Sequence, residues 1–216
     1  AGVNKFSLLA IPFFVLAGAI MAEGGMARRL VAFAGVFVGF LRGGLSLVNI
    51  LASTFFGAIS GSSVADTASI GSVLIPEMEK KGYPRDFSTA VTVSGSMQAT
   101  LLPPSHNAVI YSLAAGGGVS VAALFLAGVL PGLLLGLTIA ALCLWIARKR
   151  NFPVGERIAP KEALRISIDA LWGLMTMVII LGGILSGVFT ATESASIAVR
   201  WAFCVRVFIS RDDQGS

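Results

Sequence analysis

Charged residues are scarce in this sequence. Only 12% of its 216 residues are Asp, Glu, Lys or Arg, whereas 56% are hydrophobic; a soluble domain usually carries about 25% charged residues. The apolar excess runs along the whole chain, so one signal peptide or one amphipathic anchor cannot account for it. The composition therefore excludes an ordinary soluble domain and predicts an all-α polytopic membrane protein embedded in a lipid bilayer.

Cysteine, histidine and the familiar catalytic motifs are also rare or missing. Both cysteines lie in apolar runs, where they fit buried small side chains better than a disulfide. The sequence contains no Gly-x-Ser-x-Gly elbow, no Walker phosphate loop and no His-Glu-x-x-His zinc motif. An intramembrane serine hydrolase that uses Ser62 or Ser63 with His106 is the enzyme alternative. We expect the protein not to be an enzyme.

The basic residues lie between the apolar runs and give the chain a net charge of +5. A nucleic-acid-binding protein would carry them beside aromatic residues on a folded surface, so no nucleic-acid partner is expected. The positive-inside rule places the most basic segment, 148–166, in the cytoplasm. Counting crossings back from it puts 77–86 in the cytoplasm and the glycine turn at 116–118 outside. The same count puts Arg28 and Arg29 outside, against the rule.

Two apolar runs, 45–59 and 64–75, are each too short to cross a bilayer, and the polar sequence SGSS separates them. Such a pair predicts a re-entrant hairpin that opens to the cytoplasm near Arg42, because non-helical backbone at membrane depth must be buried in protein or line a watery cavity. The chain is then divided into transmembrane helices at 1–44, the re-entrant hairpin at 45–76, a cytoplasmic loop at 77–86, a broken helix and a following transmembrane helix at 87–147, a basic cytoplasmic loop at 148–166, and transmembrane helices with an atypical C-terminal tail at 167–216.

The expected tip of the hairpin, Ser60-Gly61-Ser62-Ser63, combines hydroxyl groups with flexible backbone. Broken membrane helices of this kind supply oxygen ligands for sodium, while the free N–H groups of the second arm can face an anion. Asp66 is an intramembrane carboxylate and thus a functional candidate, although it could also interact with the helix dipole or cap N–H groups without binding anything. Close packing of small residues is the structural alternative.

A second break is expected at LPPSHNAVIY, where Pro103 and Pro104 remove two backbone donors and leave carbonyl groups free. A cation is one possible partner for such carbonyls, and Ser105 and Asn107 add polar groups at the same depth. His106 could be a hydrogen-bonded structural residue or a proton carrier. The repeat of Gly128, Gly132 and Gly136 at a spacing of four predicts close helix packing.

Four blocks of sequence carry a family resemblance: FFGAISGSSVADTASIGSVLIPEMEKKGY, LPPSHNAVIYSLAAGG, LFLAGVLPGLLLG and GVFTATESASIA. They resemble the large membrane subunit, of the DctM type, of tripartite ATP-independent periplasmic (TRAP) transporters. The resemblance implies a sodium-driven secondary importer of organic anions such as C4-dicarboxylates, in a bacterial or archaeal cytoplasmic membrane. It also implies an inverted-repeat, elevator-type fold, a small four-helix membrane subunit of the DctQ type, and a periplasmic substrate-binding protein. Sodium would be the coupling ion, with no other cofactor.

The resemblance also implies the site residues. The residues expected near the substrate are Ser60, Gly61, Ser62, Ser63, Asp66, Pro104 and Ser105, and those expected near sodium are Ser60, Ser62, Ser63, Pro103 and Ser105. Thr190, Thr192 and Glu193 match the family without an assigned role, and Ala191 stands where the family usually has proline.

The chain departs from the family in length and in its last segment. It is about half as long as expected, so we expect a fragment that holds the first half of the inverted-repeat transporter and does not transport alone. Arg200 and Arg206 lie in the last apolar run, where each would cost about 2.5–3.5 kcal/mol at a helix centre. The alternatives are a single-component sodium/dicarboxylate carrier and a non-transporting membrane scaffold or truncated fragment.

Overall fold

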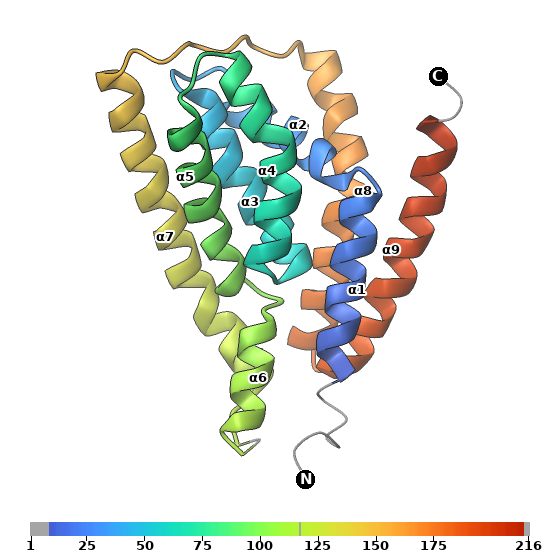
Figure 1. Ribbon diagram of the computed structural model, residues 1–216. Helices are drawn as coiled ribbons and strands as arrows, with labels where there is room; N and C mark the ends of the chain where they lie inside the picture. The colour runs from blue at the N-terminus through green and yellow to red at the C-terminus, as the bar shows by residue number, and fades with distance from the viewer. Residues whose placement is uncertain (1–8, 117, 214–216) are drawn as a thin grey trace.

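A computed structural model describes residues 9–116 and 118–213, and this part of the chain is helical with no strand. In chain order its elements are α1 (Ala10–Glu23), α2 (Met26–Val38), α3 (Gly44–Ser60), α4 (Ser63–Lys80), α5 (Arg85–Ser96), the 3-10 helix η2 (Met97–Thr100), α6 (His106–Ala114), α7 (Val121–Lys149), α8 (Pro160–Leu185) and α9 (Ala191–Asp213) (Figure 1). The all-α prediction is confirmed. The expected helix start at 6–8, Gly117 of the glycine turn and the tail at 214–216 lie outside the described residues.

α1 and α2 meet at a bend of 74° beside Gly25, instead of folding back as two antiparallel spans. α2 packs against α3 and α8. As a result Arg28 lines a pocket together with Lys81 and Glu156, and Arg29 lies 4.0 Å from Asp169 near the start of α8. The expectation that both arginines lie at the end opposite the basic loop is therefore wrong, and the physical reason is that α2 does not return along α1.

Over the segment predicted as a hairpin, α3 and α4 pack against each other and are separated by Gly61 and Ser62. We call these two residues the hairpin turn. In Figure 1 both arms run to the end of the bundle that the α7–α8 loop crosses, and the hairpin turn lies well short of the far end of α7. α4 continues through Pro76 to Lys80, past the expected end of the hairpin, so the loop predicted at 77–86 is only 81–84.

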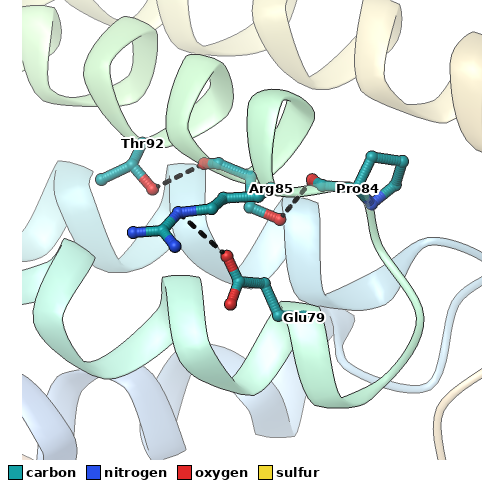
Figure 2. Close-up of polar contacts among 5 residues, drawn as sticks. Glu79, Pro84, Arg85 and Thr92 are labelled. Atoms are coloured by element: carbon teal, nitrogen blue, oxygen red, sulfur yellow. Dashed lines mark hydrogen bonds and ion pairs between the residues drawn. The ribbon is translucent and has the colours of Figure 1, made fainter.

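Polar and aromatic contacts fix the short connection between α4 and α5. Figure 2 shows Arg85 turned toward Glu79, with 3.4 Å between Nε and Oε1. At the other side of the connection Tyr83 is buried against Phe87 and Phe152, and burial raises the pKa of the Tyr83 phenol to about 12. Because Phe152 belongs to the α7–α8 loop, this cluster joins the two loops at one end of the bundle.

The α7–α8 loop, residues 150–159, also makes hydrogen bonds to the residues that directly precede α3. Arg42 donates a 2.8 Å hydrogen bond to the Asn151 side chain, and the Gly43 amide donates to the Pro153 carbonyl at 3.0 Å. The prediction that the hairpin, the α4–α5 loop and the basic loop share one end is therefore confirmed. The basic loop is shorter than the expected 148–166, because α7 continues to Lys149 and α8 begins at Pro160.

α5 is interrupted before the prolines and resumes as α6. We call residues 97–105 the proline break. The predicted glycine packing is confirmed here: an added Cβ at Gly128 would collide with the Leu101 carbonyl oxygen, one at Gly132 would touch the Leu102 side chain, and one at Gly136 would collide with Gln98. The glycine face of α7 thus lets the proline break lie directly on that helix.

α8 and α9 complete the bundle beside α1 (Figure 1). The residues Thr190 and Glu193 form a capping box: the Thr190 amide donates to Glu193 Oε2 at 2.8 Å, and the Glu193 amide donates to Thr190 Oγ1 at 3.3 Å. Arg206 pairs with Glu23 at the end of α1, at 3.1 Å, which offsets the cost of placing an arginine in an apolar run.

By length and composition α7 and α8 could each cross a membrane, and the bent pair α1 and α2 could supply a third span within the described residues. Together with the apolar composition, these helices identify a membrane protein. α9 falls outside the set of candidate spans.

Gly128→Ala should destabilise the protein by about 1–3 kcal/mol, the usual cost of overpacking, because the new methyl group meets the Leu101 carbonyl. Gly182→Ala is the matched control, since a Cβ there meets no atom within 4 Å and α8 should gain up to about 1 kcal/mol of helix propensity. Thermal unfolding in detergent measures both. Equal shifts in melting temperature would contradict the packing of the proline break on α7.

Candidate functional site

The hairpin turn lies against the proline break. Gly61 has a φ of +61°, and an added Cβ would collide with the Pro104 carbonyl oxygen. On its other side, the turn is covered by α1, where Gly18 lets the backbone of Ser60 approach closely. Gly61 requires glycine, because its backbone is left-handed and a Cβ would overlap Pro104; a Cβ at Gly18 would lie 3.1 Å from the Ser60 backbone, which would have to shift slightly. The hairpin turn and the proline break thus meet at Gly61 and Pro104.

Most of the predicted hydroxyl groups already have partners within the chain. Ser60 Oγ accepts from the Ser62 amide at 3.4 Å, and Ser62 Oγ caps α4 by accepting from the Ala65 amide at 3.4 Å. Ser105 Oγ donates to the Thr100 carbonyl at 2.6 Å. Ser63 begins α4 half-buried, and Pro103 is buried in the proline break. The structure therefore gives Ser62 and Ser105 clear structural roles. A ligand would compete with the Ala65 amide for Ser62 Oγ, whereas the lone pairs of Ser105 Oγ stay available because that hydroxyl donates its hydrogen bond.

Asp66 is different, because it is buried and has no partner. Its side chain is 0% exposed, and neither carboxylate oxygen has a hydrogen-bond partner among the described residues. The hydroxyl groups of Ser53 on α3 and Ser96 on α5 interact with it, but neither reaches it with hydrogen-bond geometry. The Ser96 hydroxyl instead donates to the Thr92 carbonyl at 2.7 Å. A buried, unpaired carboxylate is costly, so this position favours a bound cation or a proton.

The sequence reasoning missed the polar residues that surround Asp66. Asn49 donates a 2.7 Å hydrogen bond to Thr92 Oγ1, while its own Oδ1 and the Ser53 hydroxyl are buried without partners in the described part of the chain. A signal was present: small polar residues recur every three or four positions along one face of α3 and α5, at Ser46, Asn49 and Ser53, and at Ser88, Thr92 and Ser96. Such a face predicts a polar seam between apolar helices.

His106 begins α6, directly after the proline break. Its Nε2 atom is buried without a hydrogen-bond partner in the described residues, and it lies 3.5 Å from the position that a Cβ on Gly61 would occupy. The imidazole packs against the buried ring of Phe14 on α1, with 6.2 Å between ring centroids. The only histidine of the sequence therefore faces the hairpin turn.

The donor set suits a hard cation better than a transition metal. No group of three or more His, Cys, Asp or Glu side chains that could hold a metal ion occurs among the described residues. Among the described residues, the polar seam between α3, α4 and α5 offers only oxygen atoms without partners: the two carboxylate oxygens of Asp66, the Ser53 hydroxyl and the Asn49 amide oxygen. Oxygen-only sites favour hard cations.

Comparison with known proteins identifies one family of membrane transporters. Residues 1–214 match the family model of the tripartite ATP-independent periplasmic transporter, DctM component. The chain is 50% identical over 204 residues to a protein of Salmonella typhimurium named YgiK, covering 94% of this chain and 47% of that protein. It is 46% identical to the C4-dicarboxylate TRAP transporter large permease protein DctM of Pseudomonas aeruginosa, covering 97% of this chain and 48% of the relative.

A third relative is the 2,3-diketo-L-gulonate TRAP transporter large permease protein YiaN of Escherichia coli, at 38% identity over 98% of this chain and 49% of the relative. The chain thus spans about half the length of the curated relatives it matches. Since the family and the named permeases are transporters, the expectation that the protein is not an enzyme is confirmed.

Gly61→Ala should lower the melting temperature more than Gly187→Ala does. Both glycines have positive φ, +61° and +72°, so both variants carry the strain of a left-handed alanine, about 1–2 kcal/mol. Only the Gly61 variant must also push the hairpin turn away from Pro104, because a Cβ on Gly187 meets no atom within 4 Å. Thermal unfolding measures the difference. If the two variants have the same melting temperature, the hairpin turn does not pack against the proline break.

Proposed function

This chain belongs to the DctM family of tripartite ATP-independent periplasmic transporters, and from that premise we propose that it is part of the large permease subunit of a sodium-driven importer of organic anions. The intact protein works in the cytoplasmic membrane of a bacterium or archaeon. A periplasmic substrate-binding protein delivers the solute, and a small four-helix membrane subunit of the DctQ type accompanies the permease.

The observation that carries sodium coupling is the unpaired, fully buried carboxylate of Asp66. Sodium would neutralise this charge and take oxygen atoms from the surrounding polar seam, which stabilises both the ion and the carboxylate. The remaining proposed ligands are oxygen atoms in and beside the hairpin turn and in the proline break: the hydroxyls of Ser60, Ser62, Ser63 and Ser105 and the carbonyl of Pro103.

The solute is proposed to bind where the hairpin turn meets the proline break. Here α4 and α6 both begin, and the free N–H groups and dipole of a helix N-terminus favour a carboxylate. The names of two relatives support an acidic solute, because C4-dicarboxylates and 2,3-diketo-L-gulonate both carry carboxylate groups. Ser60, Gly61, Ser62, Ser63, Asp66, Pro104 and Ser105 are the residues proposed near this solute.

The contacts of the hairpin with its neighbours indicate which segments would move together during transport. The hairpin, the α4–α5 turn and the α7–α8 loop are joined by the Arg42 and Phe152 contacts, whereas α1 packs mainly on α9. We propose that α3 and α4 form a re-entrant hairpin and that the hairpin and the proline break move together as the carrier part of an elevator-type transporter. The present chain would supply the first of two inverted repeats.

Uptake by the intact transporter tests this function. The complete permease, with its small subunit and binding protein, is reconstituted in liposomes and given labelled succinate or 2,3-diketogulonate. An inward sodium gradient should drive accumulation, while potassium or a proton gradient of equal size should not. Accumulation without the binding protein would indicate a single-component carrier, and no accumulation of any acidic solute would leave the scaffold alternative.

Asp66→Asn should abolish sodium-dependent stabilisation of the purified complex. Wild-type protein should gain about 2.7 kcal/mol at a sodium concentration 100 times its dissociation constant. The variant should gain nothing, yet in sodium-free buffer it should be at least as stable as wild type, because the unpaired buried carboxylate has gone. Asp86→Asn, on the exposed first turn of α5, is the matched control. An Asp66 variant that still responds to sodium would rule out this site.

A further inference from the structure

We propose that His106 binds a carboxylate group of the transported solute through Nε2, and that this contact makes the site prefer acidic solutes. The inference rests on the proposed function and adds to it a side chain that selects the solute. His106 has no role in the proposed sodium site.

The first observation is the unused hydrogen-bonding atom. Nε2 of His106 is buried, yet it has no partner in the described part of the chain. Buried polar atoms nearly always have one, so an exception at the meeting point of two interrupted helices indicates a ligand. The same atom faces the hairpin turn, 3.5 Å from the position that a Cβ on Gly61 would take.

The second observation is that the imidazole is held in place. Phe14, which is 0% exposed, packs on one side of the ring, and the backbone at Pro104 and Ser105 sets the start of α6. A side chain fixed in this way can present Nε2 to a ligand at little entropic cost. In its neutral form the ring can carry its proton on Nε2 and donate it to a carboxylate.

The surrounding charges favour a carboxylate over a cation at this atom. The first turn of α6 offers free backbone N–H groups beside the imidazole. Asp66, the nearby acidic residue of α4, faces Ser53 and Ser96 on α3 and α5 and would be neutralised by sodium there. The imidazole therefore lies beside backbone donors that favour an anion.

Three substitutions separate the donor from the shape of the side chain. The amide of His106→Gln reaches about as far as Nε2, whereas that of His106→Asn reaches only as far as Nδ1, and His106→Leu has no donor. With the solute that wild type accumulates, Gln should keep KM within about threefold. Asn and Leu should raise KM about 10- to 100-fold, the effect of losing a hydrogen bond to a charged group. Tyr111→Phe, on the exposed side of α6, is the control.

Sodium binding is measured on the same variants, because it distinguishes this inference from the proposed function. The sodium-dependent rise in melting temperature should be unchanged in all three. An unchanged KM in the Leu variant, or a KM that rises equally in Gln and Leu, would overturn the inference while the proposed function stands. Loss of the sodium response would show that His106 holds the hairpin turn and does not select the solute. If wild type accumulates no acidic solute, both proposals fail.

Discussion

The carbonyl group of Pro104 lies against Gly61, and this approach brings two interrupted helices to the same depth of an apolar bundle. Interrupted helices leave backbone groups without partners, and such groups are tolerated inside a membrane protein only when other protein groups or a ligand satisfy them. Several features of the fold serve this contact. Gly18 admits the turn against α1, and the glycine face of α7 admits the proline break. The Ser62 cap of α4 and the hydrogen bond from Ser105 to the Thr100 carbonyl then satisfy part of the freed backbone.

A second feature of this region is a buried carboxylate without a counter-charge in the described part of the chain, that of Asp66. Asp66 is buried in a seam whose other members are neutral, and the hydroxyl of Ser53 and the amide oxygen of Asn49 have no partners there among the described residues. Stability alone does not explain a carboxylate at this place, because a small apolar side chain would avoid the cost of burying a charge. The unpartnered Nε2 of His106 belongs to a different neighbourhood of the described residues, against Gly61 and Phe14.

Much of the fold could be predicted from the sequence because its signals are local. Run length and the SGSS sequence located the hairpin, Pro103 and Pro104 located the second break, and the spacing of Gly128 and Gly136 located the close packing. The direction of α2 could not be predicted, because Gly24 and Gly25 allow any bend and packing on α3 and α8 selects 74°. The neighbours of Asp66 were also missed, since Ser53 and Ser96 come from other helices. The serine hydroxyls near the hairpin turn were predicted as ligands. The same residues also favour short-range hydrogen bonds to nearby backbone amides, and this is how Ser60 and Ser62 are used.

We propose that the hairpin turn and the proline break form one site in which Asp66 faces a sodium ion and the start of α6 faces the solute. The most direct test is a cryo-EM map of the intact transporter in sodium, compared with one in choline. We expect a density peak at coordination distance from Asp66 and the hairpin turn that is present only in sodium, with Gly61 still against Pro104. A sodium-dependent peak elsewhere, or a hairpin turn that does not touch the proline break in either map, would contradict it.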